Sequence, residues 1–153
     1  MPTTDDRTPD YQRPAELESL LGYFADRLGP VELAEIAQLP LCDEPLLYIM
    51  GCARSGTTLV YQYLTQAGLF AYPSNFLSRF YYAPYLGARL QQMLFDGDFR
   101  GEITGGDVAP NFDSQLGKTQ GPLAPHEFWY FWRRFFHFGE EQLLTDAELA
   151  AAD

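Results

Sequence analysis

Hydrophobic positions near the start of the chain predict helices. Apolar residues recur there at the three- and four-residue spacing of one helix face, at Leu17, Leu20, Leu21, Phe24 and Leu28. Pro14 suits the first turn of this helix, and Gly29-Pro30 is expected to end it. A second short helix is predicted over residues 31–39. We therefore expect a helical lead-in over residues 1–45.

The centre of the chain has a different pattern. Residues 46–50, with the sequence LLYIM, form an apolar run between a proline and a glycine. Such a run is typical of a strand buried on both faces. A glycine-bounded loop is predicted over residues 51–56, followed by a helix over 57–67 that Gly68 ends. The expected order is therefore strand, loop and helix.

Beyond this segment the sequence predicts more helices but no second convincing strand. Helices are expected over residues 75–82, 84–95, 125–138 and 146–152. A loop rich in glycine and proline is predicted over 96–124, and the helix over 125–138 is dominated by aromatic residues. A doubly wound domain needs several parallel strands. Either weak strands lie within the loop region over 96–124, or the chain is the front part of a larger domain, and we favour the second interpretation.

Composition indicates a globular protein whose charge is unevenly distributed. Hydrophobic residues make up 46% of the chain and charged residues 20%, which favours a packed core. The net charge is −11, with ten acidic and three basic residues over 1–45, and five acidic and no basic residues over 139–153. Residues 46–138 hold six acidic and seven basic residues, so this part can bind an anion. Nucleic-acid binding is not expected, because no basic stripe exists.

The sequence also bears on location. No apolar run approaches the ~20 residues of a membrane span, and the first residues lack the pattern of a secretory signal. Cys42 and Cys52 are too few for a disulfide scaffold. A cytoplasmic protein is therefore expected, in which Cys52 is interpreted as a small packing residue rather than a nucleophile.

The loop after the predicted strand has the pattern of a phosphate-binding site. Residues 51–58 read GCARSGTT, and a helix that begins there offers N–H groups without intrahelical partners at its positive end. The two glycines permit a tight turn and a close approach to an anion. Side chains that add donors are Arg54, Ser55, Thr57 and Thr58. The alternative interpretation is a strand–turn–helix connection whose glycines serve geometry only.

Comparison with the Walker A pattern, G-x-x-x-x-G-K-[ST], distinguishes phosphate binding from γ-phosphoryl transfer. Both glycines match, and Thr58 matches the final hydroxyl. Thr57 stands where the lysine of a nucleotide triphosphatase contacts the β- and γ-phosphates. The loop is therefore suited to hold a phosphate but poorly equipped for γ-phosphoryl transfer, and a P-loop kinase or other nucleotide-binding protein is an alternative.

The order of strand, basic-Ser-Gly-Thr-Thr loop and apolar helix resembles the 5′-phosphosulfate loop of sulfotransferases that use 3′-phosphoadenosine 5′-phosphosulfate (PAPS). The sequence RSGTTL at residues 54–59 is especially similar to the bacterial and Golgi-type branches. The resemblance covers about residues 46–136. It implies a P-loop NTPase-like, three-layer α/β/α sulfotransferase fold, of which this helix-rich chain holds the amino-terminal portion only. The implied division is a helical lead-in (1–45), part of the sulfotransferase domain (46–138) and an acidic tail (139–153).

By this resemblance, the protein is a transferase that uses PAPS as co-substrate and no metal. The acceptor would be a hydroxyl or amine of a small molecule, carbohydrate or lipid. Arg54 would contact the bridging or 5′-phosphate oxygens and stabilise charge on the departing phosphate. Backbone N–H groups and threonine hydroxyls would hold the 5′-phosphate. The implied co-substrate-binding residues are Arg54, Ser55, Gly56, Thr57 and Thr58.

Sulfuryl transfer to an alcohol requires a general base near the acceptor hydroxyl, usually His or Glu. His126 and Glu127, at the start of the predicted aromatic helix, are the candidates, with His126 ranked first. Sulfotransferase branches use either residue type. Lys118 is a third candidate, to assist the leaving group. The alternatives are a first-turn acid that complements the helix dipole for Glu127, and a surface residue for His126.

A second nucleotide motif of sulfotransferases, an arginine and a serine that hold the 3′-phosphate, has no match over residues 139–153. We therefore expect the activity to be incomplete in this chain as it stands. The chain is interpreted as a truncated reading frame, a fragment, or one piece of a split protein whose partner chain supplies the missing carboxy-terminal half. A non-catalytic remnant or interaction module is the alternative function.

Overall fold

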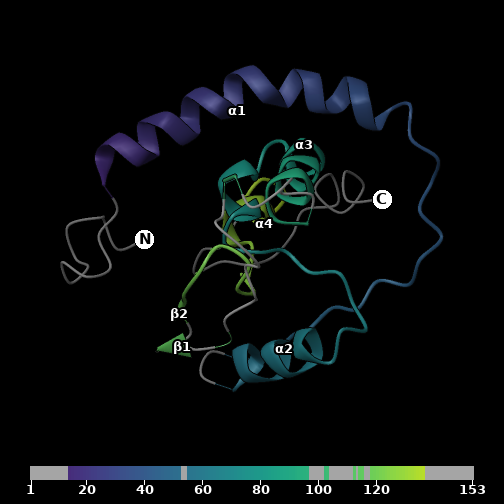
Figure 1. Ribbon diagram of the computed structural model, residues 1–153, viewed down its shortest axis with the longest axis vertical. Coiled ribbons are helices and arrows are strands. Elements are labelled where there is room, and N and C mark those ends of the chain that lie inside the picture. The colour runs from purple at the N-terminus through teal and green to yellow at the C-terminus, as the bar shows by residue number, and fades with distance from the viewer. Residues whose placement is uncertain are drawn as a thin grey trace.

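A computed structural model of the protein describes residues 14–52, 55–96, 102–103, 112, 114–115 and 118–136. Its elements are α1 (Ala15–Ile36), α2 (Thr57–Gln66), the 3-10 helix η3 (Leu77–Phe80), α3 (Pro84–Gln91), the π-helical turn η4 (Gln92–Asp96), β1 (Ser114–Gln115), β2 (Lys118–Thr119) and α4 (Trp129–Trp132). In Figure 1, α1 lies along the top of the view and α2 at the bottom, with α3 and α4 between them.

Helix α1 is a single helix of 22 residues with Pro30 inside it, so the predicted break at Gly29-Pro30 is wrong. A proline inside a helix removes one backbone hydrogen bond and its ring crowds the carbonyl four residues earlier, at a cost of about 3 kcal/mol that tertiary contacts must offset. Beyond the proline, the helix is anchored by Glu32, whose carboxylate accepts hydrogen bonds from the N–H groups of Tyr85 (2.6 Å) and Leu86 (3.0 Å). This contact with the start of α3 stabilises the second half of α1. The local sequence does not reveal the contact.

The packed core lies between α1, η3 and α3. Leu21 is 4% exposed and Ala83 is 1% exposed, and the Phe24 ring stacks on Phe80 with centroids 6.2 Å apart. A Cβ atom at Gly87 would lie 2.5 Å from Phe80 Cβ. Glycine therefore permits the close approach of α3 to η3. The predicted helix over 75–82 is shorter than expected, and the predicted helix over 84–95 is α3 followed by η4.

Residues 46–50 form no strand, so this prediction is wrong. Leu46 is 78% exposed and Met50 is 90% exposed. A strand needs a neighbour to pair its backbone groups, and within the described residues the one sheet is the antiparallel pair β1–β2. That pair does not include residues 46–50. Tyr48 instead makes a ring contact with Trp132, with centroids 6.1 Å apart.

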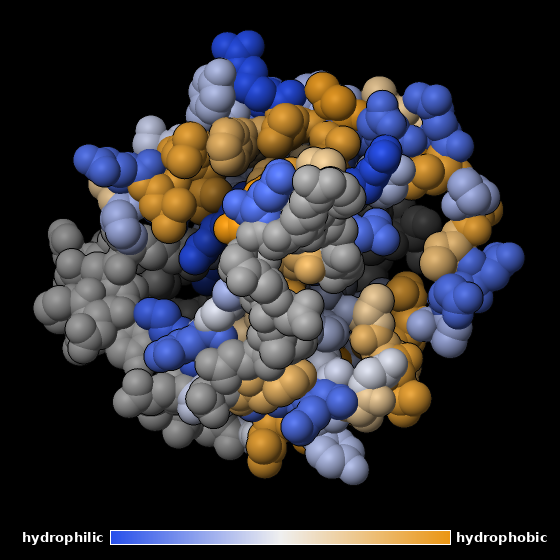
Figure 2. All heavy atoms as spheres, in the orientation of Figure 1, coloured by the Kyte–Doolittle hydropathy of each residue, from blue (hydrophilic) through white to orange (hydrophobic). Residues whose placement is uncertain are grey.

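Helix α2 confirms the predicted helix over 57–67. It begins at Thr57 and ends at Gln66, and Gly68 takes the left-handed conformation with φ of 69°. Its apolar residues face outward, with Leu59 71% exposed and Tyr63 72% exposed. Figure 2 shows further apolar side chains, in orange, on the outer surface along α1. The exposed large aliphatic residues of α1 are Leu20, Val31, Leu33 and Ile36.

The predicted aromatic helix over 125–138 is reduced to the four residues of α4. Pro125 instead forms an antiparallel bridge with Ser74, and Phe128 has a left-handed φ of 56°. Both features hold residues 125–128 out of a helix. The predicted helix over 146–152 and the acidic tail over 139–153 lie outside the described residues. Of the helices that the structure describes, none has the length and apolar character needed to cross a membrane.

Candidate functional site

The loop before α2 is folded back on itself at Gly51. A Cβ atom at this position would lie 2.5 Å from Ser55 Oγ and 2.8 Å from Thr57 Cγ2. The Ser55 N–H donates to the Cys52 carbonyl at 3.1 Å. At the other end of the loop Gly56 has φ of 86°, a left-handed conformation that L side chains rarely adopt. Glycine at position 56 is therefore required by its backbone conformation, whereas a larger residue at position 51 would force the Ser55 and Thr57 side chains to move.

The start of α2 is open in the described part of the chain. Gly56 occupies the N-cap position and has no side chain, and no side-chain hydrogen bond caps the helix. The intrahelical bonds begin with Val60, whose N–H donates to the Gly56 carbonyl at 3.1 Å. The N–H groups of residues 57–59 precede it and lack intrahelical acceptors. Such a helix start can receive an anion.

The predicted phosphate-binding residues have different surroundings. Ser55 and Gly56 are exposed, whereas Thr57 and Thr58 are half-buried. Arg54 lies outside the described residues, so its expected contact with phosphate stays a prediction. The described part of the loop therefore offers backbone donors and three hydroxyl groups at one end of α2.

The structure brings the start of α2 to one of the candidate general bases. Thr58 Oγ1 donates a hydrogen bond to Glu127 Oε1 at 2.9 Å, across 69 positions of sequence. One turn further along α2, the Tyr61 hydroxyl lies 3.2 Å from the Pro73 carbonyl and 3.4 Å from the His126 carbonyl. Two parts of the site that the sequence predicts separately are thus in direct contact.

Both carboxylate oxygens of Glu127 accept hydrogen bonds. Oε1 accepts from Thr58, and Oε2 accepts from Trp129 Nε1 at 2.5 Å. An ionised carboxylate is an acceptor-only group, so this arrangement suits the charged form. The carboxylate is consequently held in one orientation, between α2 and the beginning of α4.

His126 has a different role in the local structure. Its Nδ1 accepts a hydrogen bond from the Phe128 N–H at 2.9 Å. A neutral imidazole whose Nδ1 accepts carries its proton on Nε2. To take a proton at Nδ1 the ring would have to give up the bond to Phe128. The ring therefore stabilises the turn that presents Glu127.

That turn depends on Phe128, whose φ of 56° is unusual for a residue other than glycine. Such a conformation costs about 1–3 kcal/mol and persists only where surrounding contacts impose it. The Phe128 side chain is 6% exposed, and its ring stacks on Phe131 with centroids 4.9 Å apart. Burial of the ring and the bond to His126 together hold the backbone in this form.

Lys118 lies on β2 and is exposed. The next residue, Thr119, donates from its hydroxyl to the Pro125 carbonyl at 2.7 Å. The hairpin that carries Lys118 is thereby attached to the residue before His126. The proposed assistance to a leaving group remains a prediction.

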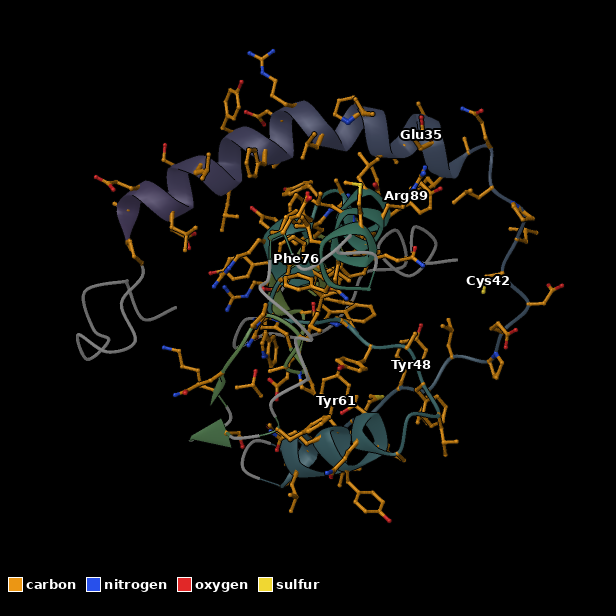
Figure 3. All side chains as sticks on the ribbon, in the orientation of Figure 1. Glu35, Cys42, Tyr48, Tyr61, Phe76 and Arg89 are labelled. Atoms are coloured by element: carbon orange, nitrogen blue, oxygen red, sulfur yellow. The ribbon has the colours of Figure 1, made fainter. Side chains whose placement is uncertain are left out.

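Sequence reasoning missed Tyr61, which links three segments. Burial raises the pKa of Tyr61, with the charges of Tyr72 and Glu127 adding to the effect, and burial also raises the pKa of Tyr72. Tyr61 therefore remains a protonated donor over the ordinary pH range. In Figure 3 it points from α2 toward the middle of the molecule.

A signal for Tyr61 was present in the sequence. Residues at i, i+3, i+4 and i+7 share one helix face, and in α2 these are Thr58, Tyr61, Gln62 and Thr65. This polar stripe is the buried face: Gln62 and Thr65 are 6% and 5% exposed, and Gln62 Nε2 donates to the Phe112 carbonyl at 2.6 Å.

Across the described residues, His, Cys, Asp and Glu side chains do not gather in groups of three or more that could hold a metal ion. The chain matches no family model, no curated protein and no solved structure.

Proposed function

We propose that the chain forms the 5′-phosphosulfate-binding part of a PAPS-dependent sulfotransferase, which transfers a sulfuryl group to a hydroxyl or amine. The proposal rests on one observation: an uncapped helix start, entered through a left-handed Gly56, is joined by Thr58 to the carboxylate of Glu127. Donors for a phosphate and an acceptor for a proton thus lie side by side. Sulfuryl transfer requires this combination.

In the proposed reaction, the phosphate is held by the N–H groups at the start of α2. The dipole of helix α2 provides only a partial positive charge, and Arg54 supplies a full one. These donors stabilise the negative charge that grows on the phosphate as the bridging S–O bond breaks. The acceptor oxygen forms the new bond to sulfur, and adenosine 3′,5′-bisphosphate leaves with the electron pair.

Glu127 takes the acceptor's proton in this proposal, and His126 supports the turn that presents it. Glu127 contacts the phosphate-binding helix, whereas the Nδ1 atom of His126 already accepts the Phe128 N–H. The geometry therefore favours Glu127 over His126. If the acceptor is an amine, the same carboxylate receives the proton from nitrogen.

Binding of the 3′-phosphate and closure of the site are assigned to further polypeptide, either more of this protein or a partner chain, that packs against the described part. The exposed apolar residues of the segment 46–50 and of α2 support this assignment. They also support the alternative function, a module that binds another protein without catalysis. The two functions differ in whether a nucleotide binds at the start of α2.

Isothermal titration calorimetry of the full-length chain with adenosine 3′,5′-bisphosphate tests the proposal. We expect binding, and we expect Arg54→Ala to raise the dissociation constant by about tenfold to a hundredfold, as for loss of a charged hydrogen bond. The matched control is Arg89→Ala, which removes the same charge from an exposed position on α3. Absence of binding by the wild-type chain would overturn the proposal, and preferential binding of ATP would favour a P-loop kinase.

A further inference from the structure

We propose that Thr58 is a positioning residue that holds Glu127 and releases it when a phosphate binds. This inference rests on the proposed function. It concerns one hydrogen bond, from Thr58 Oγ1 to Glu127 Oε1 at 2.9 Å. Through this bond, binding of the co-substrate would control whether Glu127 can act as the general base.

The threonine hydroxyl can serve only one acceptor. A hydroxyl has one hydrogen and donates to one acceptor at a time. In the structure that hydrogen is directed to Glu127. A phosphate oxygen at the start of α2 requires the same hydrogen if Thr58 is to contribute its side chain. The two bonds therefore exclude each other, and binding of a phosphate exchanges one for the other.

After this exchange the carboxylate of Glu127 keeps a second anchor. Trp129 Nε1 donates to the other oxygen, Oε2, at 2.5 Å, and the buried Phe128 fixes the backbone between the two residues. When Thr58 turns to the phosphate, the bond from Trp129 remains. The orientation of the carboxylate is retained, while Oε1 loses the donor that lowers its basicity and becomes a stronger acceptor for the proton of the acceptor substrate.

The neighbouring Thr57 is different. It is also half-buried at the start of α2, but its methyl carbon lies against Gly51, 2.8 Å from the position of an added Cβ atom. The bond to Glu127 comes from Thr58. The coupling is therefore expected at Thr58 and not at Thr57, although both threonines are proposed to contact the phosphate.

A double-mutant cycle tests the coupling. The dissociation constant of adenosine 3′,5′-bisphosphate is measured by calorimetry for the wild-type chain, Thr58→Val, Glu127→Gln and the double variant. Loss of the negative charge tightens binding in both backgrounds. In Glu127→Gln the single amide oxygen is needed by the indole N–H of Trp129, which leaves the amide NH2, a donor, facing Thr58. The threonine hydrogen is then released only where Thr58 is present, so the gain from Glu127→Gln should be about threefold to tenfold larger with Thr58 than with valine.

Matched controls isolate the hydroxyl. The same cycle with Thr57→Val should show no such difference, and Thr58→Ser, which keeps a hydroxyl, should preserve the wild-type coupling. Equal gains from Glu127→Gln in the wild-type and Thr58→Val backgrounds would overturn the inference and leave the proposed function intact. Failure of all four proteins to bind the bisphosphate would overturn both.

A second measurement avoids any substitution at Thr58. The indole N–H resonance of Trp129 is followed by NMR as the bisphosphate is added, with that of Trp132 as internal reference. Because Glu127 loses one donor, its bond from Trp129 strengthens, and we expect a downfield shift of the Trp129 signal only. A saturated complex in which the Trp129 signal moves no more than that of Trp132 would contradict the inference.

Discussion

Helices α1 and α2 contact the rest of the molecule through opposite kinds of surface. α1 packs through apolar residues, with Leu21 4% exposed and Phe24 stacked on Phe80. α2 packs through a polar stripe, with Gln62 6% exposed, and leaves Leu59 71% exposed. The part of α1 before Pro30 is therefore held by hydrophobic burial, whereas α2 is held by hydrogen bonds. The first arrangement provides stability, and the second places donors and acceptors at a site.

The largest expected effect comes from the same substitution made in each helix. Leu21→Ala should lower the free energy of unfolding by about 2–5 kcal/mol, because it leaves a cavity in the core. Leu59→Ala, on the exposed face of α2, should change it by less than about 0.5 kcal/mol. Chemical denaturation of both variants checks this. Equal losses would show that α2 is also held by its apolar residues.

The contact between α1 and α3 gives the next largest effect. Glu32 is 4% exposed and accepts hydrogen bonds from two backbone N–H groups at the start of α3. Glu32→Gln should reduce the free energy of unfolding by about 1–2 kcal/mol, since the bonds lose their charge assistance. Glu35→Gln, one turn later in α1, removes the same charge and should cause no loss. Chemical denaturation compares the two, and a Glu32→Gln variant of undiminished stability would remove Glu32 as the anchor of α1 beyond Pro30.

Replacement of glycine by alanine should have opposite effects in the two helices. Gly56 has φ of 86°, so Gly56→Ala should destabilise the start of α2 by about 1–2 kcal/mol. Gly22 lies inside α1 with nothing within 4 Å of an added Cβ atom. Gly22→Ala should stabilise the chain by about 0.5–1 kcal/mol. Thermal unfolding of both variants checks these signs, and a stabilising Gly56→Ala would contradict the described loop.

The smallest effect concerns Tyr61 and pH. Burial raises the pKa of Tyr61 above the ordinary value of about 10. Above a pH of about 10 the unfolded chain therefore loses this proton while the folded chain keeps it, and the free energy of unfolding falls as pH rises. Tyr61→Phe should cost about 1 kcal/mol at neutral pH and flatten the alkaline loss.

The control is Tyr63→Phe, which removes a hydroxyl from the exposed face of the same helix. It should leave both the stability at neutral pH and the alkaline slope unchanged. Denaturation curves between neutral pH and about pH 11, beyond the tyrosine pKa of the unfolded chain, measure both quantities. An unchanged slope in Tyr61→Phe would mean that another group causes the alkaline loss.

The sequence predicted elements that local signals determine. The bounds of α2 follow from Gly56 and Gly68, which take the left-handed conformation at its two ends. The loop before it follows from Gly51, where an added Cβ atom would meet the side chains of Ser55 and Thr57. These positions require no knowledge of distant residues, which is why they could be predicted.

Elements that depend on distant contacts were not predicted correctly. The predicted break of α1 at Pro30 ignores the bonds of Glu32 to the start of α3. The predicted helix from Pro125 ignores the bridge to Ser74. The predicted strand over 46–50 has no neighbour to pair with in the described part of the structure. Pairing requires a second segment, and the pattern of one segment does not show whether that partner exists.

The candidate site also has one part that the local sequence predicts and another that depends on distant contacts. The turn between Gly51 and Gly56 follows from local pattern, whereas the bond between Thr58 and Glu127 spans 69 positions and has no local signal. The polar stripe of α2 was visible in the sequence, but apolar rather than polar stripes are normally buried. A helix that follows a buried strand is expected to pack through apolar residues. Because we predicted such a strand, we did not expect α2 to pack through its polar stripe.

The N–H groups at the start of α2 are the proposed phosphate site, on which the assigned roles of Thr58 and Glu127 depend. Titration of the uniformly ¹⁵N-labelled chain with adenosine 3′,5′-bisphosphate tests this site residue by residue. We predict that the amide resonances of Thr57, Thr58 and Leu59 shift most, while those of α1 stay in place. Binding that shifts the resonances of α1 and leaves those three unchanged would contradict the assignment.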